Sequence, residues 1–331
     1  MYQPESYGIA LLMMLLSMIC WGSWANTMKL TPGWRFQHFY WDYVLGVLLM
    51  SLVWGLTLGS TNQGPQSFVQ NLRAADSSNI IYALLGGVVF NVANLLLVAA
   101  IEIAGLAVAF PVGIGLALVE GVVINYILAP QGNPYLLFGG LTLVVLAIVC
   151  DALAYRRKEA GSPNVTTKGI FVSLLAGVLM GLFYPFVTKA LTGTNALGPY
   201  TVGFVFAAGI LLCTIPANYM LMRRPITGGE GLTMQGYFAA RGSWHVYAIL
   251  GGLIWCTGTV LNFVAGRAQL VGPAVSYGIG NGATMVSAVW GIVVWKEFSD
   301  APVGVMRLVA LMFVLFLAGL GAIAVAPLWG A

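Results

Sequence analysis

Long apolar runs separated by short polar connections fill the chain from one end to the other. Ten such runs can be marked, near 7–28, 39–58, 80–101, 105–128, 135–155, 168–189, 199–221, 245–266, 271–295 and 303–326. A helix needs about 20 apolar residues to cross the hydrocarbon core of a bilayer, whereas the strands of a membrane barrel are about ten residues long and alternate in polarity. The pattern therefore predicts an all-α polytopic membrane protein with ten transmembrane helices.

Composition agrees with this pattern and narrows the possible partners. Hydrophobic residues make up 60% of the 331-residue chain and charged residues only 7%, against about 25% charged residues in soluble domains. The net charge of +4 is scattered, so we expect a lipid bilayer and no nucleic acid as partner. The four cysteines all fall inside apolar runs and lack metal-ligand spacing, and we expect no cofactor and no metal.

The lysines and arginines predict an orientation. Eleven fall in connections on one side of the predicted bundle and three on the other, namely Arg73, Lys189 and Arg267. Because cytoplasmic loops are enriched in these residues, both termini are expected on the periplasmic or extracellular side of a cell membrane, with a bacterial inner membrane favoured. The N-terminal stretch MYQPESYG lacks the basic residues of a cleavable signal peptide.

Two segments of the chain repeat. YALLGGVVF at 82–90 aligns with YAILGGLIW at 247–255, and GLAVAFPVGIG at 105–115 aligns with GPAVSYGIGNG at 272–282. The predicted units are therefore residues 1–160 and 161–331, each with five helices. An odd number of helices inverts the second unit, and inverted repeats allow a central site to open to each side of a membrane in turn.

Ionisable side chains inside the predicted helices are costly and therefore informative. Glu120 is the deepest of them, and burial would favour its protonated form. In the stretch WRFQHFYWDY at 34–43, His38 and Asp42 lie one helical turn apart among six aromatic residues. An interfacial aromatic belt explains the outer residues but not Asp42. We take Glu120, Asp42 and His38 as candidates for proton coupling.

Amide and aromatic side chains are the candidates for substrate binding. Buried amides need hydrogen-bond partners, and aromatic faces stack on flat rings or sugars. The Gly-rich stretches PVGIG and GIGNG could each interrupt a helix beside such a site. The candidate residues are Trp21, Trp24, Asn91, Asn94, Tyr184, Trp255, Asn262, Tyr277 and Asn281.

These same residues carry a family resemblance. CWGSWANTMKL, the following WRFQHFYWDYVLG, and the segment from GGVVFNVANLL to INYILAP resemble the ureide permease family, and the related glucose/rhamnose-type uptake proteins share the plan. The resemblance covers nearly the whole chain and implies the drug/metabolite transporter (DMT) superfamily fold of two inverted five-helix repeats. It also implies a secondary importer that is often proton-coupled. The long central loop of plant ureide permeases is missing here.

We therefore expect a secondary transporter and not an enzyme, since the motifs GxxxxGK[ST], HExxH and GxSxG are absent. The expected activity is proton-coupled import (symport) of a small neutral heterocycle, a ureide or nucleobase, by alternating access. A sugar importer of the glucose, ribose or rhamnose type, a multidrug exporter and a non-transporting membrane protein remain as alternatives. The expected assembly is a monomer or homodimer.

Overall fold

The apolar runs form long helices. The computed structural model describes residues 1–61, 63–104, 106–158, 166–226, 228, 230–268 and 270–329, and these residues contain helices and connections but no strand. The longer helices are α1 (Tyr7–Ser23), α3 (Phe36–Leu56), α5 (Ser77–Ala104), α6 (Leu106–Leu128), α7 (Pro134–Lys158), α8 (Thr167–Ala190), α9 (Pro199–Arg223), α11 (Gly242–Arg267) and α14 (Val303–Val325). The shorter ones are α2 (Asn26–Lys29), η1 (Leu58–Ser60), α4 (Phe68–Ala74), α10 (Met234–Phe238), α12 (Pro273–Gly280), α13 (Ala283–Val289), the π-helix η2 (Trp290–Val294) and η3 (Ala326–Trp329).

The prediction of about ten membrane-crossing helices is confirmed. Within the described residues, nine helical segments are long and apolar enough to span a bilayer, and the part of α6 from Val112 to Leu128 is a shorter apolar helix. The chain is thus a multi-pass membrane protein. Helix α3 begins at Phe36 rather than near residue 39, and α7 continues to Lys158. The cations in the last turn of α7 favour this extension, because they offset the negative end of the helix dipole.

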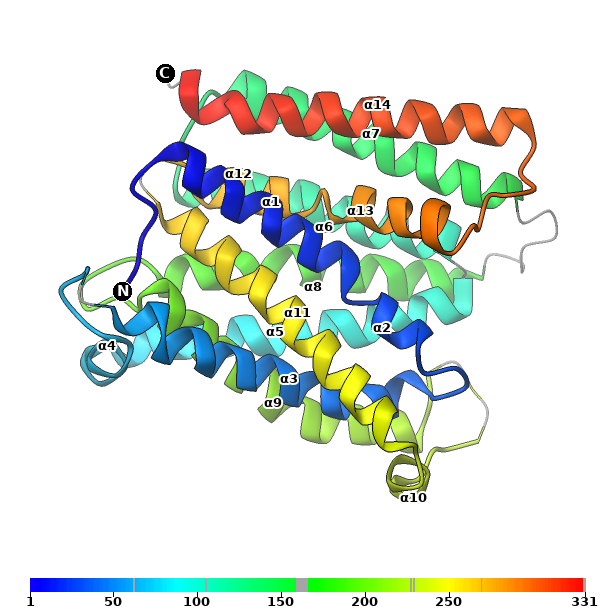
Figure 1. Ribbon diagram of the computed structural model, residues 1–331, viewed down its shortest axis with the longest axis horizontal. Coiled ribbons are helices and arrows are strands. Elements are labelled where there is room, and N and C mark those ends of the chain that lie inside the picture. The colour runs from blue at the N-terminus through cyan, green and yellow to red at the C-terminus, as the bar shows by residue number, and fades with distance from the viewer. Residues whose placement is uncertain are drawn as a thin grey trace.

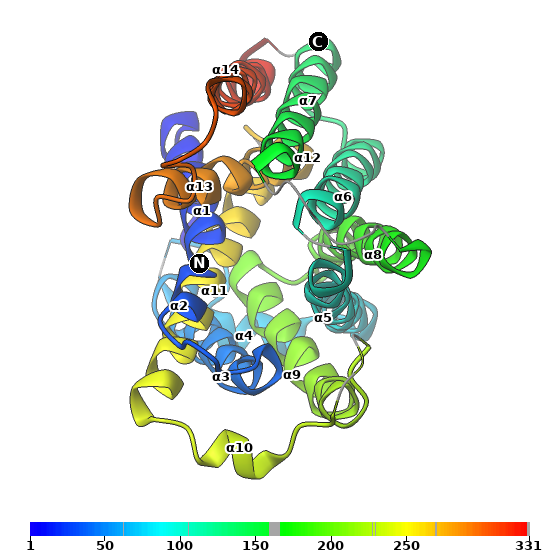
Figure 2. The same cartoon turned by 90° about the vertical axis from the view of Figure 1, so that its right-hand side faces the viewer.

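The two ends of the bundle carry different elements. Both chain termini and α4 lie at one end, and α2 and α10 lie at the other (Figure 1). We call these ends the termini face and the α10 face. Viewed along the helices, α7 and α14 pair at the periphery, while α9 and α11 lie in the interior (Figure 2).

Helix packing follows a paired plan. Helix α5 packs against α8 and α9, and α11 packs in the same way against α1 and α3. Helices α3 and α9 pack against each other, as do α6 and α12, and α7 and α14. Exchange of α1, α3, α5, α6 and α7 for α8, α9, α11, α12 and α14, in that order, leaves this list of neighbours unchanged.

Glycines permit the closest of these approaches. A Cβ atom placed on Gly87 of α5 would collide with the main-chain oxygen of Phe206 on α9, and one placed on Gly252 of α11 would collide with that of Tyr43 on α3. Small residues at such crossings let helix backbones approach closely, which is how helices associate in lipid. Gly87 and Gly252 are the last glycines of the matching stretches YALLGG and YAILGG.

One of the two Gly-rich stretches interrupts its helix. GIGNG lies at a break, since α12 ends at Gly280 and α13 begins at Ala283. Asn281 caps the broken end by donating from Nδ2 to the main-chain oxygen of Tyr277 over 2.9 Å. PVGIG does not break α6, which is continuous from Leu106 to Leu128; Gly105, in the same repeat, lies outside the described residues. Only the second stretch carries an Asn, whose side chain satisfies a carbonyl freed at the break.

Candidate functional site

A cluster of buried polar side chains joins α3, α5 and α9 within the bundle. Asn91 Oδ1 accepts hydrogen bonds from the hydroxyls of Tyr40 (2.8 Å) and Thr214 (2.9 Å), and Asn94 Nδ2 donates to the Tyr40 hydroxyl over 3.2 Å. Tyr40, Asn91 and Thr214 are fully buried. The two predicted amides are thus brought together, and Tyr40 and Thr214 were not among the predicted binding residues.

The side-chain N–H group of Asn91 is unpaired within the described residues. Its Nδ2 atom is buried and has no hydrogen-bond partner in the described part of the chain. Leaving a buried polar group unpaired costs about 1–3 kcal/mol, so a solute that offers an oxygen to this amide would recover that energy. The hydroxyl of Tyr43, one turn from Tyr40 on α3, is likewise buried without a partner among the described residues.

Aromatic rings lie against this cluster. Phe90, the neighbour of Asn91 on α5, stacks on Trp255 with ring centroids 4.5 Å apart, and Trp255 also stacks on Phe206 at 6.3 Å. Trp24 packs on Tyr43 at 4.8 Å. These separations are typical of favourable aromatic pairs. The rings supply flat apolar faces next to amide and hydroxyl groups, which is the combination that a planar polar ring requires.

The other predicted amides form a second cluster among α1, α11 and α12. Asn262 Nδ2 donates to the Ser17 hydroxyl (3.2 Å) and to the main-chain oxygen of Ser276 (2.9 Å), and the Ser276 hydroxyl donates back to the Asn262 main-chain oxygen. The indole of Trp21 donates to the Thr259 hydroxyl over 3.0 Å. Asn262 Oδ1 is buried without a partner among the described residues, whereas the other hydrogen bonds named here join α1, α11 and α12.

The remaining candidates belong to this second cluster. The Tyr184 hydroxyl donates to the main-chain oxygen of Asn262 over 3.3 Å, and the Tyr184 and Tyr277 rings are 5.0 Å apart. Asn281 caps the break between α12 and α13 and does not reach Asn91 or Asn94 by any recorded hydrogen bond. Trp255 connects the clusters, because it stacks on Phe90 and, at 6.5 Å, on Trp21.

Glu120 lies on α6 against α8. One of its carboxylate oxygens is buried and has no hydrogen-bond partner in the described residues, and a Cβ atom on Gly181 would come within 3.0 Å of it. Glu120 and Asp42 therefore face different helices, since Asp42 contacts α10 and α11.

Asp42 sits in a short hydrogen-bond network at the α10 face. Its Oδ2 is 2.6 Å from Nδ1 of His245, and its Oδ1 accepts from the Tyr237 hydroxyl over 2.6 Å. His38 and Asp42 lie one helical turn apart, but the structure records no hydrogen bond between their side chains in the described part of the chain. The His38 ring instead lies 3.0 Å from the main-chain oxygen of Thr233, and the two oxygens of Asp42 have their partners on α10 and α11.

Helix α10 is therefore tied to α3 at several points. Trp34 stacks on the Tyr237 ring at 6.2 Å and meets the His245 ring edge-on at 5.1 Å. Burial, followed by the adjacent Asp42 carboxylate, raises the pKa of Tyr237, which stays a neutral hydrogen-bond donor. The sequence did not predict His245 and Tyr237 as partners of Asp42. They lie some 200 residues from it in the chain, and the pattern of neighbouring residues does not reveal a contact over that separation.

A second set of contacts joins α1 and α2 to the end of η2 on the same face. Lys29 Nζ lies 2.6 Å from Glu297 and over the Trp295 ring. The Trp295 indole donates to Asn26 Oδ1 over 2.6 Å, and that of Trp290 donates to the Ser23 hydroxyl over 2.9 Å. With the α10 contacts, they join the helices at this face of the bundle.

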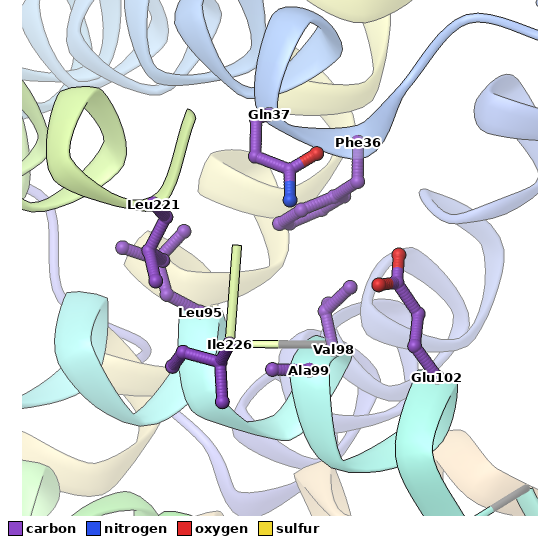
Figure 3. Close-up of a pocket in the computed structure, with 8 residues that line it drawn as sticks. All are labelled: Phe36, Gln37, Leu95, Val98, Ala99, Glu102, Leu221 and Ile226. Atoms are coloured by element: carbon purple, nitrogen blue, oxygen red, sulfur yellow. The ribbon is translucent and has the colours of Figure 1, made fainter. Parts of the chain in front are cut away.

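The recorded cavities at the two faces differ in size. At the α10 face, a cavity between the start of α3 and the end of α5 has a volume of about 10 Å³ and is bordered by Gln37 and Glu102 (Figure 3). That is about the space of one water molecule. At the termini face, a cavity of about 470 Å³ lies beside Arg267 and the N-terminal segment. Small-ligand sites commonly measure 300–1,000 Å³.

Comparison with known proteins identifies the relatives of this chain. The ureide permease family model matches residues 39–165 and 158–326. Ureide permease 2 and ureide permease 1 of Arabidopsis thaliana are each 24% identical, the first over 90% of this chain and 92% of its own length and the second over 96% of both. A Listeria innocua protein named for sugar uptake is 22% identical over 73% of this chain and 78% of its own length.

Solved structures support the fold alone. One protein known from a crystal structure superposes with a TM-score of 0.66 over 96% of each chain, at 15% sequence identity. The family model, in contrast, covers nearly all of the sequence, including α3 with Asp42 and α5 with Asn91 and Asn94. This multi-pass membrane protein belongs to the ureide permease family.

Proposed function

We propose that the protein is a proton-coupled secondary transporter that imports a small neutral heterocycle, a ureide or a nucleobase, by alternating access. The observation that carries the proposal is the unpaired Asn91 amide beside Tyr43 and the stacked rings of Phe90 and Trp255. Ureides and nucleobases are flat or nearly flat and alternate C=O with N–H groups. Amide and hydroxyl groups match their edges, and aromatic rings match their faces.

The alternating-access part of the proposal rests on a two-repeat plan, residues 1–160 and 161–331. It is supported by the exchangeable list of helix neighbours and by the matched Gly87 and Gly252 crossings. Phe90 and Trp255, which correspond in the repeat alignment, stack on each other. A substrate site next to this pair would lie where the two units meet, as in other inverted-repeat transporters.

Proton coupling is proposed for Asp42, with His245 in the role that the sequence had given to His38. A carboxylate paired with an imidazole can relay a proton, and histidine is a common proton shuttle. The pair lies beside α10, at the face expected to be cytoplasmic in a bacterial inner membrane. Glu120, with its unpaired carboxylate oxygen, is a second candidate.

The test is thermal unfolding of the purified protein with allantoin, uracil, xanthine, glucose, ribose or rhamnose. Binding to the folded state stabilises it by about 2.7 kcal/mol at a ligand concentration of a hundred times Kd. A shift with a heterocycle, and uptake of the same compound into proteoliposomes driven by an inward proton gradient, are expected. The sugar-uptake relative from Listeria favours a second candidate, a sugar importer. A shift with sugars alone would support that candidate and overturn the first.

A further inference from the structure

The cavities at the two faces of the bundle occupy corresponding places. In the repeat alignment, Gly87 of α5 corresponds to Gly252 of α11, and at the same offset Glu102 corresponds to Arg267. Glu102 lines the cavity at the α10 face, and Arg267 lines the cavity at the termini face. One pair of equivalent positions thus marks both cavities.

Helices α3 and α9 give a second, independent correspondence. Gly87 contacts α9 at Phe206 and Ile210, and Gly252 contacts α3 at Tyr43 and Val47. Phe206 therefore corresponds to Tyr43, and Ile210 corresponds to Val47, with the same difference in residue number in both pairs. The same offset relates the first residues of the two helices, Phe36 of α3 and Pro199 of α9.

Carried to the cavities, this second offset pairs two lining residues of one cavity with two of the other. Phe36 and Ile226 border the cavity at the α10 face, and their counterparts Pro199 and Gln63 border the one at the termini face. Three positions from three elements therefore correspond. The two cavities thus share three corresponding positions at opposite ends of the bundle; we call the small one at the α10 face the closed cavity and the large one at the termini face the open cavity.

The open cavity differs from its closed counterpart in chemistry. Its lining includes Arg267, Glu5, Gln3 and Gln63, which are exposed to solvent and have no recorded hydrogen bond or ion pair within the described residues, so their polar groups are accessible to a solute. Arg267 offers N–H donors, Glu5 offers acceptors, and the two glutamines offer both. The closed cavity has mainly apolar walls, with Gln37 and Glu102 as its polar side chains.

We propose that the cavity at the termini face is a capture site for an uncharged solute that presents adjacent C=O and N–H groups, of the imide or ureide class. Arg267 binds a carbonyl oxygen of this solute, and Glu5 accepts from an N–H group. The solute binds there while the α10 face is closed, and it moves to the Asn91 cluster afterwards. This inference rests on the proposed function, since it assigns the site at which the same substrate first binds.

The first arm of the test measures binding in the cavity without measuring transport. Gln63→Cys places a thiol on the exposed cavity lining, and Ser78→Cys places one on the same face at the start of α5, outside the lining. Each variant is labelled with a membrane-impermeant maleimide in vesicles, with the unmodified protein as the background for its four native cysteines. Allantoin, uracil or xanthine at about ten times Kd should slow labelling of Gln63→Cys about tenfold and leave Ser78→Cys unchanged.

The second arm measures uptake. Arg267→Ala should raise KM about tenfold with little change in kcat, because capture precedes translocation. Arg73→Ala, on α4 of the same face but outside the lining, is the control and should keep the KM of the unmodified protein.

The arms separate the inference from the proposed function. Protection of Gln63→Cys without uptake by the unmodified protein would sustain the capture site and overturn the transport proposal. Uptake with no protection by any of the three solutes, or with an unchanged KM in Arg267→Ala, would overturn the capture site and leave the transport proposal standing. If both fail, both are wrong.

Discussion

At the scale of single residues, Asn91 holds the polar cluster together. Asn91→Ala removes the acceptor of the buried Tyr40 hydroxyl, and we expect a loss of about 1–3 kcal/mol in the free energy of unfolding together with loss of the thermal shift caused by the substrate. Asn94→Ala is the matched control, because it removes a single donor to Tyr40, and it should keep a reduced shift. Thermal unfolding with and without the solute measures both effects. An unchanged shift in Asn91→Ala would place the binding site elsewhere.

At the same scale, Glu297 makes a pH-dependent contribution to the stability of the folded protein. Burial raises its pKa, but the hydrogen bonds from Lys29 and Tyr155 more than offset burial, so that the pKa is lowered overall. A carboxylate with a lowered folded-state pKa stabilises fully above its ordinary pKa near 4.3, and this stabilisation is lost as the pH falls through the folded-state value. Both partners are partly exposed, so the pair contributes at most about 1 kcal/mol.

Thermal unfolding between pH 7 and pH 3 checks this sign. Glu297→Gln should unfold at a lower temperature than the unmodified protein near neutral pH, and the two curves should converge at the acidic end. Asp300→Asn, an exposed carboxylate in the same connection, is the control and should show a smaller difference. A difference that grows toward low pH would contradict the assignment.

At the scale of elements, α10 acts as a strap across one face of the bundle. Tyr237→Phe removes one of the two partners of Asp42 while it preserves the ring that stacks on Trp34. The expected result is faster hydrogen exchange in α10 and its flanking residues, since the loss of a hydrogen bond to a charged group costs about 1.5–3 kcal/mol. The control is Phe238→Leu at the exposed neighbouring position. Equal exchange in Tyr237→Phe and the unmodified protein would show that the strap is held by packing alone.

The elements also show what sequence pattern can predict. Apolar run length was sufficient for the long helices, because a helix in lipid must satisfy its own main-chain groups. It was not sufficient for α2, α4 and α10, which are four to seven residues long and lie in the connections. Asp42 was recognised as unusual by its depth, but its partners His245 and Tyr237 depend on how α10 folds back over α3.

At the scale of the whole molecule, the candidate site was predicted in part. Asn91 and Asn94 share a helix face, so their spacing alone placed them together. Asn262 and Asn281 were grouped with them by residue type, yet they serve another cluster and a helix end. Residue type does not tell an amide that joins helices from one that keeps a free donor, because the difference lies in the geometry of its neighbours.

The two-repeat plan makes a prediction about the whole molecule. If α5 and α11 are equivalent, Gly87→Ala and Gly252→Ala should do equal damage, since each added methyl group collides with a main-chain oxygen of the helix it crosses, α9 or α3. Main-chain atoms cannot move aside as a flexible side chain can, so both helix pairs must separate, and overpacking of this kind typically costs about 1–3 kcal/mol. Gly139→Ala on α7 is the control, because a Cβ atom there meets no atom within 4 Å. Monodisperse yield and thermal midpoint are the measurements. Comparable losses at both crossings, with none at Gly139, are expected, whereas a loss at only one crossing would show that the two units are packed by different means and would remove the support that these glycines give to the repeat.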